Sequence, residues 1–352
     1  MEHAVIMAGG GGTRLWPLSR AQRPKQLLRL FDKVSLLRLS YERAAALLPA
    51  ERIYVITLAG YLPLVAEELP ELPGENLLDE PVPRDTANAV ALSAAILARR
   101  DPDAVLAVLT ADQLISPLAE FRRAVETGLR LAREYPDALV TFGIRPQRAE
   151  TQFGYVRRGK ALAPGVYEVE KFTEKPTAET AEQYIRSGNY YWNSGMFAWR
   201  AETILAQLRE RLPAAHEAGV RLAATWGTPQ GQRALAETYP ALPKISIDFA
   251  VLEQAPRVLV VEMDCQWQDV GSWAALARAL PADADGNVNA AGQVVQLRSR
   301  GNLVVSEQAH LIATLGVQDL VIVHAADATL ICHKDQAANL KELLGLIGEG
   351  RT

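Results

Sequence analysis

Short apolar runs that alternate with amphipathic helical stretches restrict the fold of this 352-residue chain more than any other feature. The runs predict strands at 4–8, 53–57, 104–110 and 138–144, and the stretches between them predict helices at 36–48, 86–99 and 121–134. Strands that alternate with helices in this way belong to a mostly parallel sheet that is covered on both faces. We therefore predict an α/β fold.

The pattern changes twice further along the chain. Short strands are predicted at 154–158, 166–172 and 191–200, followed by helices as far as about residue 252. From residue 283, turn residues recur every few positions between short β-type segments, and a closing helix is predicted at 336–347. We therefore predict two domains, one of residues 1–280 and a small β-rich one of residues 281–352.

Composition excludes several classes of partner. Hydrophobic residues make up 49% of the chain, and 37 basic against 41 acidic side chains give a net charge of -4, which argues against nucleic acid and anionic membrane surfaces. No apolar run approaches the ~20 residues that cross a bilayer. Cys265 and Cys332 lie far apart without zinc-ligand spacing, and no basic-then-apolar leader precedes Gly9. We expect a reducing, cytoplasmic setting from these features.

A run of four glycines, Gly9 to Gly12, directly follows the first predicted strand. It is not a P-loop, because Thr13 and Arg14 stand where Lys and Ser/Thr are needed, and prolines interrupt the helix that a dinucleotide-binding fingerprint requires. The amides of such a loop can approach a nucleotide closely, and the side chains of Arg14 and Lys25 are then at phosphate reach. Taken alone, these residues also fit a flexible turn with two surface cations.

Five motifs follow one another along residues 4 to 275. They are GGxGTRLxPL with the subsequent PK, then FTEKP (172–176), WNSGMF (192–197), SIDFAVLE (246–253) and WQDVGSW (267–273). Together they resemble the mannose-1-phosphate guanylyltransferases, a group within the sugar-1-phosphate nucleotidyltransferases, or nucleoside-diphosphate-sugar pyrophosphorylases. The resemblance implies a Rossmann-like nucleotidyltransferase domain with a mixed, mostly parallel sheet. It also implies a C-terminal module similar to a short left-handed β-helix.

In this family a sugar 1-phosphate attacks the α-phosphorus of a nucleoside triphosphate and expels pyrophosphate, so two highly charged anions must meet in line. The resemblance implies that the nucleotide binds at the glycine loop, through Ala8, Gly9, Gly10, Gly12 and Thr13. It further implies that Arg14 steadies the departing β- and γ-phosphates and that Lys25 lies against the transferred phosphate. Lys25 is one of only eight lysines beside 29 arginines, and a compact ammonium suits a migrating charge.

Sugar recognition is expected in the second half of the first domain. By resemblance, Glu174 accepts hydrogen bonds from sugar hydroxyls, Asn193 donates and accepts, and Lys175 binds the sugar phosphate. Gly154 leaves room for a sugar hydroxyl against the backbone. Without the resemblance, Glu174 and Lys175 fit a solvated pair before a proline turn, and the segment around Asn193 fits a core strand.

Two aspartates at the ends of predicted strands, Asp112 and Asp269, match residues that bind Mg²⁺ in the family. Hard carboxylate oxygens suit Mg²⁺, whereas the five scattered histidines and two cysteines offer no zinc pattern. A single aspartate at a strand end is also a common helix cap or turn former. The metal assignment therefore depends on the neighbouring phosphate-binding motifs.

The segment from Pro81 to Ala94 resembles the guanine side of the family's site, with Arg84, Asp85 and Thr86 opening a helix. Acceptors there match the N1–H and amino group of guanine, but Asp85 fits a helix N-cap equally well. Asp85 stands where Asn is common, Asn88 where Pro is common, and Gln113 where His usually follows the metal-binding aspartate. These departures leave the choice of base open.

The resemblance implies an enzyme that makes GDP-mannose and pyrophosphate from GTP and mannose 1-phosphate, with Mg²⁺ as cofactor. The alternatives are a nucleotidyltransferase for another pair of nucleoside triphosphate and hexose 1-phosphate, and a non-catalytic sensor of nucleotide sugars. About 70 residues follow Pro281, too few for an added isomerase domain, so we expect no phosphomannose isomerase activity. In the family such a C-terminal module can pack on the catalytic domain or on a partner subunit, and from this resemblance we expect a homodimer.

Overall fold

The computed structural model describes residues 1–10, 13–31 and 34–348, so Gly12, predicted to bind the nucleotide, lies outside the described residues. The chain divides into two compact units. Unit 1 consists of Met1–Gly9, Ser40–Thr110 and Ile115–Trp267, and unit 2 consists of Gly10–Leu39, Ala111–Leu114 and Gln268–Thr352. Each unit has a hydrophobic core of its own. The domain boundary expected near residue 280 stays a prediction.

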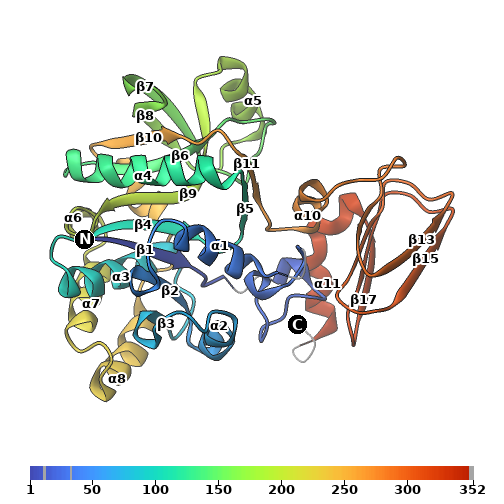
Figure 1. The fold of residues 1–352 in the computed structure, drawn as a ribbon, viewed down its shortest axis with the longest axis horizontal. Coiled ribbons are helices and arrows are strands. Elements are labelled where there is room, and N and C mark those ends of the chain that lie inside the picture. The colour runs from blue at the N-terminus through green and yellow to red at the C-terminus, as the bar shows by residue number, and fades with distance from the viewer. Residues whose placement is uncertain (11–12, 32–33, 349–352) are drawn as a thin grey trace. The chain divides into compact units, whose positions relative to one another are not determined.

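Within the described residues, a nine-stranded mixed sheet forms the centre of unit 1, in the order β3-β2-β1-β4-β9-β6-β10-β8-β7 (Figure 1). Its strands are β1 (Glu2–Met7), β2 (Ile53–Leu58), β3 (Leu77–Glu80), β4 (Val105–Thr110), β6 (Leu139–Ile144), β7 (Tyr155–Ala163), β8 (Val166–Thr173), β9 (Tyr190–Arg200) and β10 (Val258–Glu262). Adjacent strands from β3 to β4 are parallel, as are β6 and β10, whereas β9 is antiparallel to β4 and β6. This arrangement confirms the predicted mixed α/β sheet.

The central strands are apolar because both of their faces are covered. In β1, Ala4 lies opposite Ile53 of β2 and opposite Ala107 of β4, and the four middle residues of the strand are buried. A strand of this kind needs a nearly continuous apolar run, which is the pattern that predicted β1, β2, β4 and β6. Gly9 follows β1, and Glu80 is the last residue of β3. Because β1, β2 and β3 are parallel, both residues lie at the edge of the sheet where the carboxyl ends of these strands meet.

Helices cover this sheet and pack on one another. Besides α1 (Leu36–Ala45), which begins in unit 2, they are α2 (Leu62–Glu68), α3 (Thr86–Arg100), α4 (Leu118–Glu134), α5 (Ala178–Ser187), α6 (Ala201–Arg211), α7 (Pro213–Ala224), α8 (Pro229–Thr238) and α9 (Ile247–Ala250). Helix α4 packs against β4, β6 and β9, and α3 packs against α6 and α7. None of the helices in the described part of the chain is long and apolar enough to cross a membrane.

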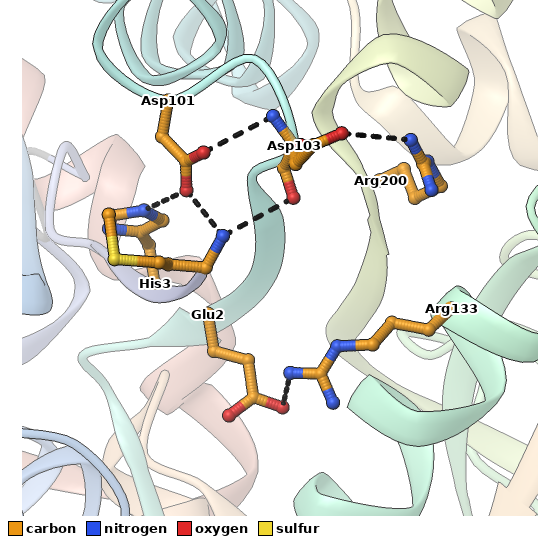
Figure 2. Close-up of polar contacts among 7 residues, drawn as sticks. Glu2, His3, Asp101, Asp103, Arg133 and Arg200 are labelled. Atoms are coloured by element: carbon orange, nitrogen blue, oxygen red, sulfur yellow. Dashed lines mark hydrogen bonds and ion pairs between the residues drawn. The ribbon is translucent and has the colours of Figure 1, made fainter.

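Ionic contacts fix the beginning of β1 to neighbouring elements (Figure 2). The carboxylate of Asp101, which follows α3, lies 3.0 Å from Nε2 of His3 and 2.5 Å from the amino nitrogen of Met1. Glu2 forms an ion pair with Arg133 of α4. Burial lowers the pKa of His3 in spite of the nearby Asp101 carboxylate, so we expect a neutral imidazole at pH 7.

Unit 2 contains two parallel ladders of short strands. One sheet has the order β12 (Val288–Ala290), β14 (Leu303–Ser306), β16 (Leu320–His324) and β17 (Thr329–His333), and the other pairs β13 (Gln293–Leu297) with β15 (Leu311–Leu315). Strands β12, β14 and β16 are parallel, as are β13 and β15. Because the chain alternates between the two ladders, its turns stack as the coils of a β-helix. The predicted β-helix-like module is confirmed, and its left-handedness stays a prediction.

Short elements account for most differences from the expected pattern. The strand β3 was not predicted, because its four residues, LLDE, are too few to show a period and half of them are acidic. The predicted closing helix is divided into a 3-10 turn (Lys334–Asn339) and α11 (Leu340–Ile347). Unit 2 also contains α10 (Trp273–Ala279), and β5 (Gln113–Ser116) pairs with β11 (Gln266–Asp269) in a separate two-stranded sheet.

Candidate active site

Three of the predicted catalytic residues come together in unit 2. Lys25 begins a 3-10 turn after Pro24, and its side chain is only 15% exposed. Its ammonium nitrogen lies 2.6 Å from Oδ2 of Asp112 and 4.0 Å from Oδ1 of Asp269. The backbone N–H of Val270 donates a 3.0 Å hydrogen bond to the carbonyl of Asp112, which joins the two aspartate-bearing segments. Residues far apart in the sequence thus place two carboxylates around one cation.

The surroundings keep Lys25 charged. Burial of the side chain favours the neutral amine, but the carboxylates of Asp112 and Asp269 outweigh it and raise the pKa of Lys25 above its usual value. The nearby charge of Arg14 acts weakly in the opposite direction. An ammonium held in a mostly covered position is suited to contact a phosphate oxygen.

Contrary to the prediction, Asp269 does not lie at the end of the apolar strand that precedes it in the sequence. The run itself forms β10, which ends at Glu262, whereas Asp269 is the last residue of the separate strand β11. Strand β11 lacks fully buried residues, so it is not a continuation of the apolar run. Asp112 does follow its apolar strand, β4, after an intervening Ala111.

The remaining unit 2 residues of the predicted phosphate site lie near the glycine run. Thr13 and Arg14 belong to a 3-10 turn (Thr13–Leu15), and both are exposed. The carbonyl of Gly10 accepts a 3.2 Å hydrogen bond from the side-chain amide of Gln26, the residue after Lys25. A hydrogen bond from Gln26 thus holds Gly10 to the segment that carries Lys25, and Arg14 is exposed.

On the nucleotide side of unit 1, Gly9 lies against a carboxylate that the sequence did not single out. A Cβ on Gly9 would lie 2.8 Å from Oε2 of Glu80, so a side chain at this position would require the glutamate to shift. Burial raises the pKa of Glu80 to about 7, although the hydroxyl of Tyr239 donates a 2.6 Å hydrogen bond to its Oε1. Ala8 uses its N–H and carbonyl in hydrogen bonds to Ile56 and Thr57 of β2.

The predicted base-binding side chains all make contacts with backbone. Asp85 caps α3 by accepting a 2.8 Å hydrogen bond from the N–H of Thr86, and it does so at a φ of 65°, which is unusual for a residue with a side chain. The hydroxyl of Thr86 accepts a 2.9 Å hydrogen bond from the N–H of Ile247. Arg84 donates to the carbonyl of Pro240. The helix-cap interpretation of Asp85 is therefore the one that the structure shows, and a role in base binding stays a prediction.

The predicted sugar-binding residues are neighbours in unit 1. A Cβ on Gly154 would overlap Oε2 of Glu174 and come within 3.2 Å of the Cβ of Asn193. The N–H of Asn193 donates a 2.8 Å hydrogen bond to the carbonyl of Gly154. Lys175 Nζ lies 3.1 Å from Oε1 of Glu174, and the lysine side chain is half exposed. Four residues from three separate segments of the chain thus lie next to one another.

Two further carboxylates complete this acidic group, here called the sugar-side cluster: Glu174, Asn193, Asp248 and Glu253. Asn193 donates a 2.8 Å hydrogen bond to Oδ1 of Asp248, and Glu253 accepts one of 2.9 Å from the N–H of Glu174. Burial raises the pKa of Glu174, against the effect of Lys175. Burial, and next the nearby Glu174, raise the pKa of Asp248 to about 7. The motif SIDFAVLE contains Asp248 and Glu253, to which no role was assigned from the sequence. Their acidic side chains, within a motif of the resemblance, were the signal that could have identified them.

Carboxylates with raised pKa values cluster at functional sites. Their oxygens accept hydrogen bonds, and sugar hydroxyls donate them. No group of three or more His, Cys, Asp and Glu side chains in the described ranges is arranged to hold a metal ion by itself. The pair Asp112 and Asp269 supplies two carboxylates, which is the share that a protein commonly contributes when Mg²⁺ also binds substrate phosphates and water.

Known proteins resemble this chain over nearly its whole length. Residues 3–286 match the nucleotidyl transferase family, and residues 292–346 match the MannoseP isomerase/GMP-like beta-helix domain. A mannose-1-phosphate guanylyltransferase from Klebsiella pneumoniae is 39% identical over 99% of this chain and 74% of its own length. One from Escherichia coli is 38% identical over the same shares of the two chains.

Solved structures agree with these sequence relatives. A structure described as mannose-1-phosphate geranyltransferase from Thermus thermophilus has a TM-score of 0.88 and 40% identity, covering 98% of this chain and 99% of that one. A UDP-glucose pyrophosphorylase in complex with UDP-glucose has a TM-score of 0.51 at 18% identity, covers 79% of this chain and 97% of that chain, and shares the fold alone. The chain therefore belongs to the nucleotidyl transferase family, among the mannose-1-phosphate guanylyltransferases.

Proposed function

We propose that this protein transfers GMP from GTP to mannose 1-phosphate and releases pyrophosphate, giving GDP-mannose. The observation that carries the proposal is the likeness to curated mannose-1-phosphate guanylyltransferases over 99% of the chain. The residues of both candidate subsites support it, because a covered ammonium beside two carboxylates suits phosphoryl chemistry and an acidic cluster suits a sugar.

In this reaction a phosphate oxygen of mannose 1-phosphate forms a bond to the α-phosphorus of GTP. The bond from that phosphorus to the oxygen of the β-phosphate breaks, and the electron pair leaves with pyrophosphate. Lys25 binds the transferred phosphate, and Arg14 binds the departing β- and γ-phosphates. Both side chains stabilise negative charge as it moves from one bond to the other.

Asp112 and Asp269 would hold a Mg²⁺ ion. Their fit to such an ion is supported by their convergence on a single cation, the Lys25 ammonium. When bound, the metal supplies neutralisation of phosphate charge and helps to orient the reactants. The protein's own contribution is to keep the two carboxylates close to each other and to Lys25.

On the sugar side, Glu174 and Asp248 accept hydrogen bonds from mannose hydroxyls, and Asn193 orients the Asp248 carboxylate. Lys175 binds the sugar phosphate through its half-exposed ammonium. Gly154 lets the backbone approach Glu174 closely, and a side chain there would displace the carboxylate.

On the base side, Glu80 offers a carboxylate to the N1–H and amino group of guanine. Asp85 uses one oxygen as a helix cap and Glu80 accepts from Tyr239 through Oε1, but only Glu80 of these two has its second oxygen close to Gly9 of the glycine run. A carboxylate acceptor favours guanine, because adenine has no N1–H to donate.

Pyrophosphate release measured with a panel of substrates tests this function. We expect turnover with GTP and mannose 1-phosphate in the presence of Mg²⁺, and at least tenfold lower kcat/KM with ATP, UTP or dTTP and with other hexose 1-phosphates. Preference for another pair would favour a related nucleotidyltransferase. Nucleotide-sugar binding without any pyrophosphate release would favour the non-catalytic sensor.

A further inference from the structure

One segment of unit 1 contacts both the base side and the sugar side of the proposed site. This segment, residues 239–248, is here called the strap. At its first residue, the Tyr239 hydroxyl donates a 2.6 Å hydrogen bond to Glu80. At its last residue, Asp248 accepts a 2.8 Å hydrogen bond from Asn193. The two ends of the strap therefore hold side chains that we assign to different substrates.

The strap is also attached, between its two ends, to the first turn of α3 and to Arg84, which precedes this helix. Arg84 and Asn88 donate to the carbonyls of Pro240 and Pro243, the latter at 2.8 Å. Two more hydrogen bonds join the strap to the first turn of α3. The N–H of Ala87 donates to the carbonyl of Ile245 at 3.2 Å, and the N–H of Ile247 donates to the hydroxyl of Thr86 at 2.9 Å. The strap and the beginning of α3 are thus joined by these four hydrogen bonds.

Asn88 lies buried at this junction. Its side chain is 1% exposed and donates from Nδ2 to the carbonyls of both Arg84 and Pro243, each at 2.8 Å. Its Oδ1 is buried, and the described residues offer it no hydrogen-bond partner. The two hydrogen bonds from Nδ2 thus join Arg84, which precedes α3, to Pro243 of the strap through one side chain.

We propose that Asn88 and Tyr239 are positioning residues, and that the strap sets the placement of Glu80 for the nucleotide and of Asp248 for the sugar phosphate at the same time. The proposal rests on the proposed function for its naming of the two substrates. Tyr239 acts at one end only, through Glu80. Asn88 acts on the middle, so its effect reaches both ends.

Three variants separate these effects. Asn88→Ala removes both donors from the middle of the strap, and Tyr239→Phe removes one hydroxyl from its first residue. Lys244→Ala is the control, because Lys244 is exposed on the same segment and has no place in the site. Steady-state kinetics use the substrate pair that the wild-type enzyme prefers in the panel.

We expect Asn88→Ala to raise the KM of both substrates by roughly tenfold, with kcat changed by less than about threefold, because misplaced binding groups weaken ground-state and transition-state binding alike. Tyr239→Phe is expected to raise the nucleotide KM alone. Lys244→Ala is expected to change neither. Asn88→Ser, a small residue that retains one donor, is expected to fall between wild type and Asn88→Ala, and it provides a second test if the alanine variant does not fold.

Two readouts distinguish positioning from a general loss of stability. Hydrogen exchange in Asn88→Ala should become faster in the strap but not in β6 or α4. In the wild type, the hydrogen bond from the Tyr239 hydroxyl lowers the pKa of Glu80. Tyr239→Phe removes this bond and should raise that pKa, so the pH below which the nucleotide KM rises should move upward. Asp85 is the charged group near Glu80, and Arg84 lies near Tyr239; both are unchanged in this variant.

A change in one KM only for Asn88→Ala, or unchanged KM values with a loosened strap, would overturn the proposal. If the wild-type enzyme prefers a pair of substrates other than GTP and mannose 1-phosphate, the proposed function is wrong. The KM values of the variants for the preferred pair then still test the positioning role of the strap. If there is no turnover, calorimetric dissociation constants for GTP and mannose 1-phosphate replace KM. Absence of binding by both compounds overturns the proposed function and the strap together.

Discussion

Two carboxylates of unit 1 approach the backbone at glycines, which places their oxygens where a side chain would otherwise stand. Glu80 lies against Gly9, and Glu174 lies against Gly154. Both carboxylates have a raised pKa because they are buried, and the ion pair with Lys175 offsets the burial of Glu174 only in part. Groups kept in such an unfavourable state are candidates for ligand contact, since a bound donor replaces the lost water.

Asp269 is the residue with the sharpest expected effect on turnover. Replacement of Asp269 by Asn should keep the fold and lower turnover by roughly 10²-fold or more, because an amide is a poorer ligand for a hard cation and preorganised charge dominates such sites. Excess Mg²⁺ should restore only part of the loss. Near-normal turnover of this variant at limiting Mg²⁺ would contradict the assignment and leave Asp269 as a turn former.

Asp248 gives the protein a predictable dependence on pH. The pKa of Asp248 is raised to about 7 in the folded chain from an ordinary value of 3.8, so the unfolded state ionises first as the pH rises. The free energy of unfolding therefore falls as the pH rises from about 4 to 7. Above pH 7 the folded state carries the full cost of the buried Asp248 charge. Asp248→Asn removes that cost.

We accordingly expect Asp248→Asn to unfold at a higher temperature than wild type at pH 8, by roughly 3 °C or more, with the difference disappearing near pH 4. Its KM for the sugar phosphate should rise at the same time, because a charged acceptor is lost. Thermal unfolding across this pH range, together with kinetics at pH 8, provides the measurement. A variant less stable than wild type at pH 8 would show that the Asp248 carboxylate is compensated in the fold.

At the scale of elements, the first turn of α3 combines a helix cap with a strained backbone. Asp85 accepts from the N–H of Thr86 at a φ of 65°. Asp85→Ala should lower the free energy of unfolding by about 1–3 kcal/mol, because the cap is lost while the strained φ remains. The KM for GTP should change by less than about threefold. Chemical denaturation and kinetics measure the two effects, and Asp85→Gly, which tolerates the positive φ, is the matched control.

A large loss of discrimination between GTP and ATP in Asp85→Ala, with normal stability, would instead assign base recognition to Asp85. This element also shows what the sequence could predict. The apolar period located α3 within one residue at its C-terminal end, since a long periodic helix carries a strong signal. The choice between cap and ligand for Asp85 depends on which donor faces its oxygens, and the sequence does not specify that.

The site shows the same division. Motif identity predicted Glu174, Asn193 and Gly154, and the structure places them together. Glu80 was missed, because its four-residue strand has no periodic signal and its partner Tyr239 is 159 residues away. Contacts of that separation depend on the tertiary fold, so local patterns do not encode them.

For the whole molecule, cohesion within each unit comes from its own core. The core of unit 1 is built around α3 and the sheet, and the core of unit 2 joins the segment after the glycine run to the inward side chains of the β-helix. In unit 2, the salt bridges Arg20–Asp327 and Arg23–Glu307 also connect this segment with the β-helix. The segment that carries Lys25 is thus held by residues from the C-terminal module.

The outward face of β13 and β15 exposes apolar side chains that bear on the oligomeric state. Leu297 and Leu315 lie opposite each other in the parallel ladder and are 58% and 67% exposed. Val295 and Leu311 extend this apolar strip along the same strands. Contiguous apolar side chains of this kind are costly to leave in water, and a second copy of the chain offers the same uncharged strip in return.

We expect a homodimer that buries this strip. Wild-type protein should have twice the mass of one chain in analytical ultracentrifugation at micromolar concentration, because a shared apolar strip of leucine and valine is stabilised by burial. Leu297→Lys combined with Leu315→Lys should give a monomer that retains its thermal unfolding temperature within about 3 °C, since both side chains are already exposed in the single chain. The matched control is Lys341→Ala, an exposed change in α11. A wild-type mass of one chain would refute the homodimer, and a dimer that survives the double substitution would move its interface to another surface.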